Sequence, residues 1–257
     1  METTMLKILC LLGLGLLWLP VAANPLPDTI DRVRPSVVAV GTLVSGRVRL
    51  KKPLAVYRGT GFVVGDGTLV VTNHHVVNHP LDTEKGERLA VFSGRGRQGR
   101  SHGARILRSD PEHDLALLRI DGGPLPALKL HRGRVREGRA VALTGFPIGM
   151  VLGLYPATHR GILAAIVPAA IPAPAGQKLT AARLRRLKHP FEIYQLDAVA
   201  YPGNSGSPVY LPENGEVVGV INSVFVKGSK EDALRHPSGI SYAIPVRWVR
   251  RLLEEQP

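Results

Sequence analysis

The chain has 257 residues, 28 of them glycine and 21 proline, and aromatic residues make up 5% of it. This length and turn-rich composition are typical of one large all-β domain or two small ones, and they argue against a bundle of long helices. The formal net charge of +13 favours encounters with anionic surfaces. The basic residues are scattered without an aromatic stacking platform, so we expect no specific nucleic-acid binding.

Residues 1–23 have the pattern of a signal peptide. Lys7 precedes an apolar run, Ile8 to Leu19, and Pro20 ends that run. Ala23 lies where a signal peptidase accepts a small residue, so we expect cleavage after it and export to the periplasm or the medium. The run is shorter than the ~20 residues that span a bilayer, which disfavours the alternative of an uncleaved anchor. Cys10 is the one cysteine of the sequence, so the mature chain would hold no disulfide.

Short strands separated by turn residues are predicted for most of the remaining sequence. Segment 29–33 is expected to form a helical turn capped by Asp28 or Thr29. Gly65-Asp66-Gly67 separates two β-branched runs, which predicts a hairpin. The expected strands are 36–43, 59–64, 68–72, 89–92, 104–107, 116–120, 140–144, 161–166, 193–196, 207–210, 217–223 and 240–243. Short strands at regular spacing are typical of a β-barrel or a β-sandwich.

Two further segments have the pattern of helices. Residues 180–188 are basic, and we expect a surface helix there. Residues 245–255 follow the last predicted strand, with Pro245 at the first helical position. Trp248, Val249 and Leu252 could then pack inward. We interpret both helices as structural elements rather than as membrane or partner-binding helices.

Three short motifs contain residue types used in nucleophilic catalysis. They surround His75, Asp114 and Ser205, in that order along the chain. The order His, Asp, Ser is that of chymotrypsin, whereas subtilisin and the α/β-hydrolases have other orders. Each motif alone is common in turns and at strand ends, so the prediction depends on the three occurring together.

These residue types are the ones that a serine needs for peptide-bond cleavage. A serine hydroxyl is a weak nucleophile until a base takes its proton. We assign that base to His75, which can return the proton to the leaving amine. The Asp114 carboxylate would hold the imidazole in the right tautomer and stabilise its cation. Glycines beside Ser205 let backbone N–H groups approach a developing oxyanion, and the expected donors are those of Gly203 and Ser205.

The motifs resemble those of trypsin-like peptidases of the HtrA (Deg) type, and the resemblance runs from about residue 30 to residue 253. Further matching segments are 34–38, 59–62, 144–149, 195–206, 220–223 and 242–245. The resemblance implies an all-β fold of two six-stranded antiparallel barrels with the active site between them. The implied bounds are 36–122 for the first barrel, 138–244 for the second and 245–255 for a C-terminal helix.

Matching to the family pattern assigns the site residue by residue. The base is His75 rather than its neighbour His74, and the acid is Asp114 rather than Asp110. The specificity pocket would be lined by Val199, Ala200, Ile221, Asn222 and Ser223. These side chains are uncharged, so we expect a small or medium apolar side chain at the substrate's P1 position. No spacing of His, Cys and carboxylates points to a metal, and no cofactor is expected.

Three features depart from the family pattern. Ser207 stands where a glycine is usual, and this variant also resembles glutamyl endopeptidases. The stretch 168–188 resembles an activation or specificity loop in its position. We also expect no PDZ domain after the last helix, which leaves the oligomeric state open.

The sequence therefore predicts an exported serine endopeptidase that acts on unfolded proteins or peptides. The alternative is a peptide-binding module on the same fold, with its catalysis unused. Contacts with anionic surfaces through the basic charge are an additional expectation, which does not compete with the first.

Overall fold

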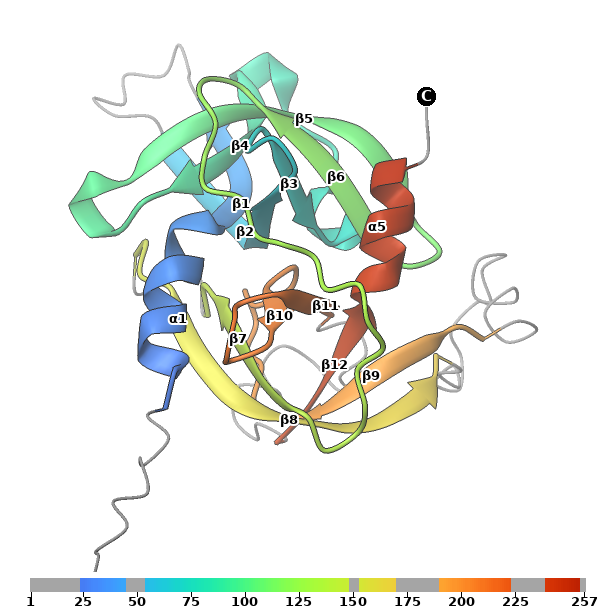
Figure 1. Ribbon diagram of the computed structural model, residues 1–257. Coiled ribbons are helices and arrows are strands. Elements are labelled where there is room, and N and C mark those ends of the chain that lie inside the picture. The colour runs from blue at the N-terminus through green and yellow to red at the C-terminus, as the bar shows by residue number, and fades with distance from the viewer. Residues whose placement is uncertain (1–23, 45–53, 148–152, 170–189, 223–238, 255–257) are drawn as a thin grey trace, which may run out of the picture.

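The structure is a computed structural model that describes residues 24–44, 54–147, 153–169, 190–222 and 239–254 (Figure 1). The predicted signal peptide 1–23, the predicted helix 180–188 and most of the predicted loop 168–188 lie outside these ranges. None of the helices in the described ranges is long and apolar enough to cross a membrane.

The described strands form two closed antiparallel barrels of six strands each, which confirms the predicted fold class. The first barrel consists of β1 (Val37–Val44), β2 (Leu54–Val64), β3 (Leu69–Thr72), β4 (Glu87–Ser93), β5 (Arg100–Asp110) and β6 (Leu115–Ile120). The second consists of β7 (Ala140–Gly145), β8 (Ala157–Pro168), β9 (Glu192–Asp197), β10 (Pro208–Tyr210), β11 (Val217–Ile221) and β12 (Ile240–Pro245). Their orders around the barrels are β1-β2-β3-β6-β5-β4 and β10-β11-β12-β9-β8-β7.

Strand β5 is longer than the apolar pattern predicted. It spans 100–110 instead of 104–107, and its side chains are exposed or half-buried. Backbone pairing with β4 and β6 extends β5 over polar residues, which a sequence pattern of apolar residues does not reveal. A register shift between Ile106 and Arg108 marks a bulge in the same strand.

Each barrel has an apolar core, and a further core joins the two. Val38 and Leu118 pack inside the first barrel, and Leu143 and Leu196 pack inside the second. The joining core, here called the interbarrel seam, contains Phe62, Val71, Leu115 and Leu117 from the first barrel and Val217, Val220 and Ile244 from the second. Burying each large side chain of this kind contributes about 1.5–3 kcal/mol, so the seam favours one arrangement of the two barrels.

Helix α1 (Leu26–Val33) begins earlier than the predicted turn at 29–33. Its N-cap is Pro25, and the Asn24 side-chain oxygen accepts a hydrogen bond from the first helical N–H at 3.2 Å. The predicted caps Asp28 and Thr29 therefore lie inside the helix, because Pro25 already has helical backbone angles. The helix packs into a core that also contains residues of β1 and β7, so it contacts both barrels.

Helix α5 (Val246–Glu254) covers the interbarrel seam. It rises from β12 alongside β6 (Figure 1). Val249 and Leu252 are buried, as predicted. Pro245 is the last residue of β12, where it pairs with Gly219, and not the first residue of the helix. The described ranges also contain α2 (His74–Val77) and 3-10 turns at Arg34–Ser36, Thr83–Lys85 and Gly96–Gln98.

Arg108 of the first barrel caps the C-terminal end of α5. Its Nη1 donates hydrogen bonds to the carbonyl oxygens of Leu252 at 2.9 Å and Leu253 at 3.1 Å. The last carbonyls of a helix have no partner within the helix, and a cation there also offsets the negative end of the helix dipole.

Arg108→Ala should lower the free energy of unfolding by about 1–2 kcal/mol, because two hydrogen bonds from a charged donor are lost. Urea unfolding of the full chain measures this change. Arg105→Ala removes an exposed arginine from the same strand and should change stability little. Equal effects of the two substitutions would contradict the capping role.

Candidate active site

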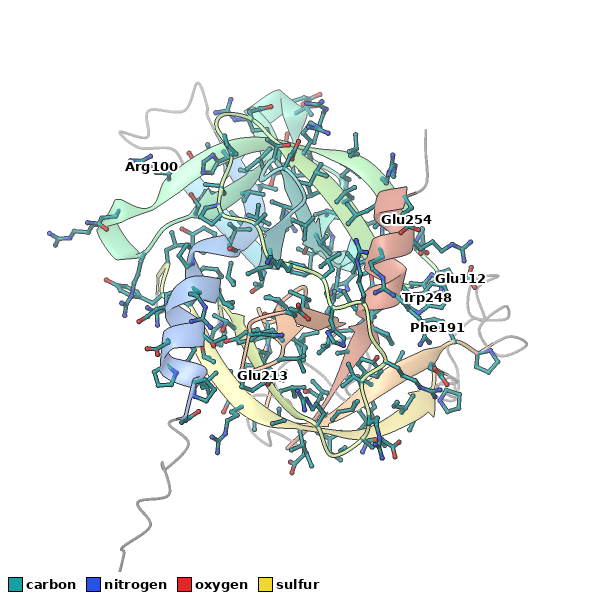
Figure 2. The ribbon with its side chains drawn as sticks, viewed as in Figure 1. Arg100, Glu112, Phe191, Glu213, Trp248 and Glu254 are labelled. Carbon is teal, nitrogen blue, oxygen red and sulfur yellow. The ribbon has the colours of Figure 1, made fainter. Side chains whose placement is uncertain are left out.

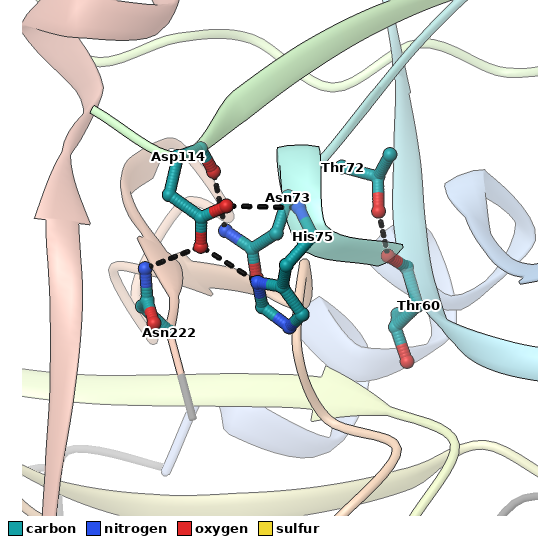
Figure 3. A network of polar contacts seen from close by, with 6 residues as sticks. All are labelled: Thr60, Thr72, Asn73, His75, Asp114 and Asn222. Carbon is teal, nitrogen blue, oxygen red and sulfur yellow. Dashed lines mark hydrogen bonds and ion pairs between the residues drawn. The ribbon is translucent and has the colours of Figure 1, made fainter. Parts of the chain in front are cut away.

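His75 and Asp114 form a doubly hydrogen-bonded pair (Figure 3). His75 lies on α2, the single helical turn after β3. Its ring Nδ1 is 2.7 Å from Asp114 Oδ2, and its backbone N–H donates to Asp114 Oδ1 at 2.9 Å. A carboxylate at Nδ1 favours the tautomer with its proton there, which leaves the lone pair on Nε2. The His75 side chain is 34% exposed, so its ring remains accessible.

Asp114 itself is held in a strained backbone conformation. Its φ is +52°, and no other non-glycine residue in the described ranges has a positive φ. Its carbonyl oxygen accepts hydrogen bonds from the His74 N–H at 3.1 Å and from Asn73 Nδ2 at 3.0 Å. Asn222 Nδ2 donates to its Oδ2 at 2.8 Å, from the second barrel. The buried carboxylate is thus oriented from both barrels.

Ser205 lies in a tight turn before β10 that requires glycine on either side. Gly203 and Gly206 have φ values of +99° and +88°, a region that side chains rarely adopt. A side chain at position 206 would also lie 2.0 Å from the Thr60 carbonyl oxygen. The Gly206 N–H donates to the Ile221 carbonyl at 3.0 Å, which ties the turn to β11.

Thr60 of β2 holds this turn against the first barrel. Its N–H donates to the Ser205 carbonyl at 2.8 Å, and its hydroxyl donates to the Gly203 carbonyl at 2.7 Å. The same hydroxyl accepts the Phe146 N–H at 3.0 Å. Thr72 donates to the Thr60 carbonyl at 2.7 Å, as Figure 3 shows. Thr60 therefore fixes the serine turn by contacts that reach both barrels.

Gly59 brings the backbone of Ser205 close to the helical turn that carries His75. A side chain at position 59 would meet Val76 at 2.7 Å and the Ser205 carbonyl oxygen at 3.0 Å. Since Val76 directly follows His75, the structure gathers His75, Asp114 and Ser205 at one junction between the barrels. Among the described residues, the hydrogen-bond partner of the His75 ring is Asp114 and not Ser205. Contacts between a nucleophile and its base often tighten only when substrate binds.

The neighbouring histidine and aspartate have other environments. His74 Nδ1 is buried and lacks a hydrogen-bond partner within the described part of the chain. Asp110 pairs with His113 and not with His75. In the described ranges, no group of three or more His, Cys, Asp or Glu side chains could hold a metal ion.

The residues predicted to line a specificity pocket have different surroundings. Val199 lines an open cavity of about 760 Å³ together with Asp197 and Arg160. Ile221 is buried in the core of the second barrel, and Ala200 packs against that core. The side chain of the fourth predicted residue, Asn222, contacts Asp114, and Ser223 lies outside the described residues.

Sequence reasoning missed the contacts that Thr60, Asn73 and Asn222 make with the site. Thr60 belongs to a glycine-flanked segment and Asn73 adjoins the histidine motif, so both lie in stretches that the resemblance had singled out. No local pattern indicates that Thr60 contacts a turn more than 140 residues away, because such a contact arises only when the two barrels pack.

Ser207 packs beside Gly145, a residue that has no room for a side chain. A Cβ atom at position 145 would lie 2.0 Å from Ser207 Oγ and 2.8 Å from Asn204 Oδ1. Both of those atoms are buried and lack a hydrogen-bond partner among the described residues. The serine at the position where the family usually has glycine is therefore accommodated by a glycine on β7.

Three comparisons place the chain among known peptidases. A family model described as "Trypsin-like peptidase domain" matches residues 59–220. The chain is 32% identical over 238 residues to "Serine protease HTRA1A" of Danio rerio, covering 90% of this chain and 41% of that protein. It is 31% identical over 201 residues to "Probable periplasmic serine endoprotease DegP-like" of Chlamydia trachomatis serovar D, covering 77% of this chain and 33% of that protein.

The solved structure "HtrA-type protease AlgW with decapeptide" shares the fold. It aligns with a TM-score of 0.64 and 24% sequence identity, covering 89% of this chain and 66% of that chain. The chain spans 41% and 33% of the lengths of the HTRA1A and DegP-like relatives.

Gly145→Ala should destabilise the protein by about 1–3 kcal/mol, because the new methyl group overlaps Ser207 and Asn204 and must displace the serine turn. Thermal unfolding measures the loss. Adding Ser207→Gly should recover part of it, since the closest overlapping atom is then absent. If the double variant is no more stable than Gly145→Ala alone, the two positions are not packed as described.

Proposed function

Because the chain belongs to the trypsin-like peptidases and is similar to HtrA proteases, we propose that it is a serine endopeptidase of the HtrA type that cleaves proteins through an acyl-enzyme on Ser205. The observation that carries this proposal is the His75–Asp114 pair beside the glycine-bracketed turn of Ser205. The chain covers less than half of the length of the HTRA1A relative, so the proposed activity is that of the protease domain alone.

The proposed reaction begins at the hydroxyl of Ser205. His75 Nε2 takes the hydroxyl proton as Ser205 Oγ attacks the peptide carbonyl, and His75 then gives that proton to the leaving amine. Water, activated by the same histidine, hydrolyses the acyl-enzyme. Asp114 stabilises the imidazolium formed in each step, and its burial strengthens this attraction because the local dielectric is low.

We assign the oxyanion donors to the backbone N–H groups of Gly203 and Ser205. The Gly203 carbonyl is held by the Thr60 hydroxyl, and the Asn204 N–H donates to the Tyr201 carbonyl at 2.9 Å. These contacts keep the turn in one conformation, so the donors need no reorganisation during the reaction.

The proposed substrates are unfolded proteins and peptides. In support, one structural neighbour, the HtrA-type protease AlgW, was solved with a decapeptide. We propose that the segments 199–200 and 221–223 border the pocket for the P1 side chain, with the Ile221 side chain in the barrel core and the Asn222 amide on Asp114. The P1 side chain should be small or medium and apolar. Export through the predicted signal peptide is part of the same proposal, and a relative named periplasmic supports it.

The full chain should react with a fluorophosphonate probe and cleave a dye-labelled unfolded protein, and Ser205→Ala should do neither. Gel fluorescence measures the labelling, and release of dye measures the cleavage. Because Ser205 lies in a buried turn, thermal unfolding must show that the variant is folded. An unlabelled wild type that binds the unfolded protein without cutting it would overturn this proposal in favour of a peptide-binding module.

Asn222→Ala should lower kcat/KM by about 10-fold, because the Asp114 carboxylate loses a donor that helps to orient it. Asn222→Asp keeps the shape of the side chain but places a second carboxylate beside that of Asp114. It should therefore lower kcat/KM at neutral pH more than Asn222→Ala does. Initial rates of cleavage, with stability measured in parallel, test this order. The reverse order would exclude an electrostatic role for Asn222.

A further inference from the structure

A second histidine–aspartate pair adjoins the first along the chain. His113 Nδ1 is 2.6 Å from Asp110 Oδ2, and the His113 N–H donates to Asp110 Oδ1 at 3.1 Å. Asp110 therefore holds the ring and backbone of His113 as Asp114 holds those of His75. Burial alone would raise the pKa of the Asp110 carboxyl, but the hydrogen bonds from His113 outweigh burial and keep that pKa below its ordinary value. Asp110 is thus a carboxylate at neutral pH.

The ring of His113 packs against two aromatic side chains, which also contact each other and are together called the aromatic clasp here. It stacks on Trp248 of α5, with ring centroids 3.7 Å apart and planes inclined by 21°. It also meets Phe191, the residue before β9, edge to face at 4.5 Å. Phe191 and Trp248 lie together beside α5 in Figure 2. His113 itself is 7% exposed, so most of its ring surface is covered.

The contact with Trp248 is made through the ring face. The Trp248 Nε1 is buried and lacks a hydrogen-bond partner among the described residues. The guanidinium groups of Arg247 and Arg251 lie 5.5 and 5.8 Å from the Trp248 ring centroid. The Trp248 indole therefore makes these contacts through its ring face, and His113 is the residue of the first barrel that stacks on it.

His113 immediately precedes Asp114, whose backbone is held at a φ of +52°. The turn that carries Asp114 is thus anchored to the second barrel on both sides. On one side, Asn222 donates to the Asp114 carboxylate. On the other, His113 packs against both Trp248 and Phe191. The second barrel also carries Ser205. The contacts that anchor His113 and Asp114 therefore affect the distance between Ser205 and His75.

We propose that His113 is a positioning residue: its ring, oriented by Asp110 and clasped by Trp248 and Phe191, aligns the Asp114–His75 pair with Ser205. This inference rests on the proposed serine-peptidase function. The aromatic clasp anchors the turn, and the Asp110 hydrogen bonds orient the ring within it.

The experiment compares His113→Ala, His113→Phe and Asp110→Asn in the full chain. His113→Ala should lower kcat for the dye-labelled unfolded protein by about 10- to 100-fold with KM nearly unchanged, because the acid–base pair is displaced by a fraction of an ångström to an ångström. His113→Phe keeps a planar ring in the clasp and should recover kcat to within a few-fold. Asp110→Asn should lower kcat a few-fold.

A spectroscopic readout tests positioning independently of turnover. In proton NMR, the hydrogen-bonded Nδ1 proton of His75 should give a low-field signal in the wild type. His113→Ala should shift or broaden that signal, and His113→Phe should restore it. His131→Ala is the matched control, because His131 pairs with Glu216 at 2.7 Å but lies away from Asp114 along the chain. It should leave both kcat and the signal unchanged.

The inference is overturned if His113→Ala keeps wild-type kcat, or if it loses stability while the His75 signal stays in place. It is also overturned if His131→Ala has the same effects as His113→Ala. A wild type that neither reacts with the fluorophosphonate nor cleaves would refute the proposed function instead. In that case the His75 signal in the His113 variants still decides whether the clasp positions the pair.

Discussion

Two hydrogen bonds from Thr60 hold the turn of Ser205 against the barrel that carries His75. One runs from the Thr60 N–H to the Ser205 carbonyl and the other from its hydroxyl to the Gly203 carbonyl. A site divided between two barrels requires such a junction, because a misplacement of 1 Å can cost about 100-fold in rate. The glycine at position 206 follows from the same junction, since any side chain there would overlap the Thr60 carbonyl.

The apolar seam maintains the arrangement that this polar junction needs. Phe62 of the first barrel and Val220 of the second are fully buried together, and Val249 of α5 packs with them. Close-packed interiors shift little without cost, so the seam resists sliding of one barrel on the other. The hydrogen bonds then select a precise geometry within an arrangement that burial has already restricted. Helix α1 adds a further contact with both barrels.

Much of the fold could be predicted because short sequence patterns indicate where the strands and turns lie. Runs of β-branched residues and glycine-rich turns locate the strands, and the resemblance implied their closure into barrels. The same information failed where local chemistry is uninformative. Strand β5 runs through exposed polar residues, and α1 begins directly after Pro25, whose helical geometry the pattern of caps does not reveal.

The candidate site divides along the same line. His75, Asp114 and Ser205 lie in motifs that sequence alone singles out, and their roles remain proposals. Residues that act through long-range contacts were not predictable in that way. Asn222 was expected to line the specificity pocket, and the contact of its amide with Asp114, 108 residues away, was not predicted. Contacts of this kind depend on how the barrels pack, and no spacing within a motif encodes that packing.

The position of α5 has a consequence for the order in which the molecule can be built. The helix packs against Leu115 and Leu117 of the first barrel, although it follows the last strand of the second. A chain emerging from the ribosome therefore completes the strands of its first barrel long before the helix that covers them exists. Until α5 is made, the apolar flank of β6 stays exposed and the ring of Trp248 is not there to meet His113. Assembly of the proposed catalytic junction therefore requires the chain to be complete through α5.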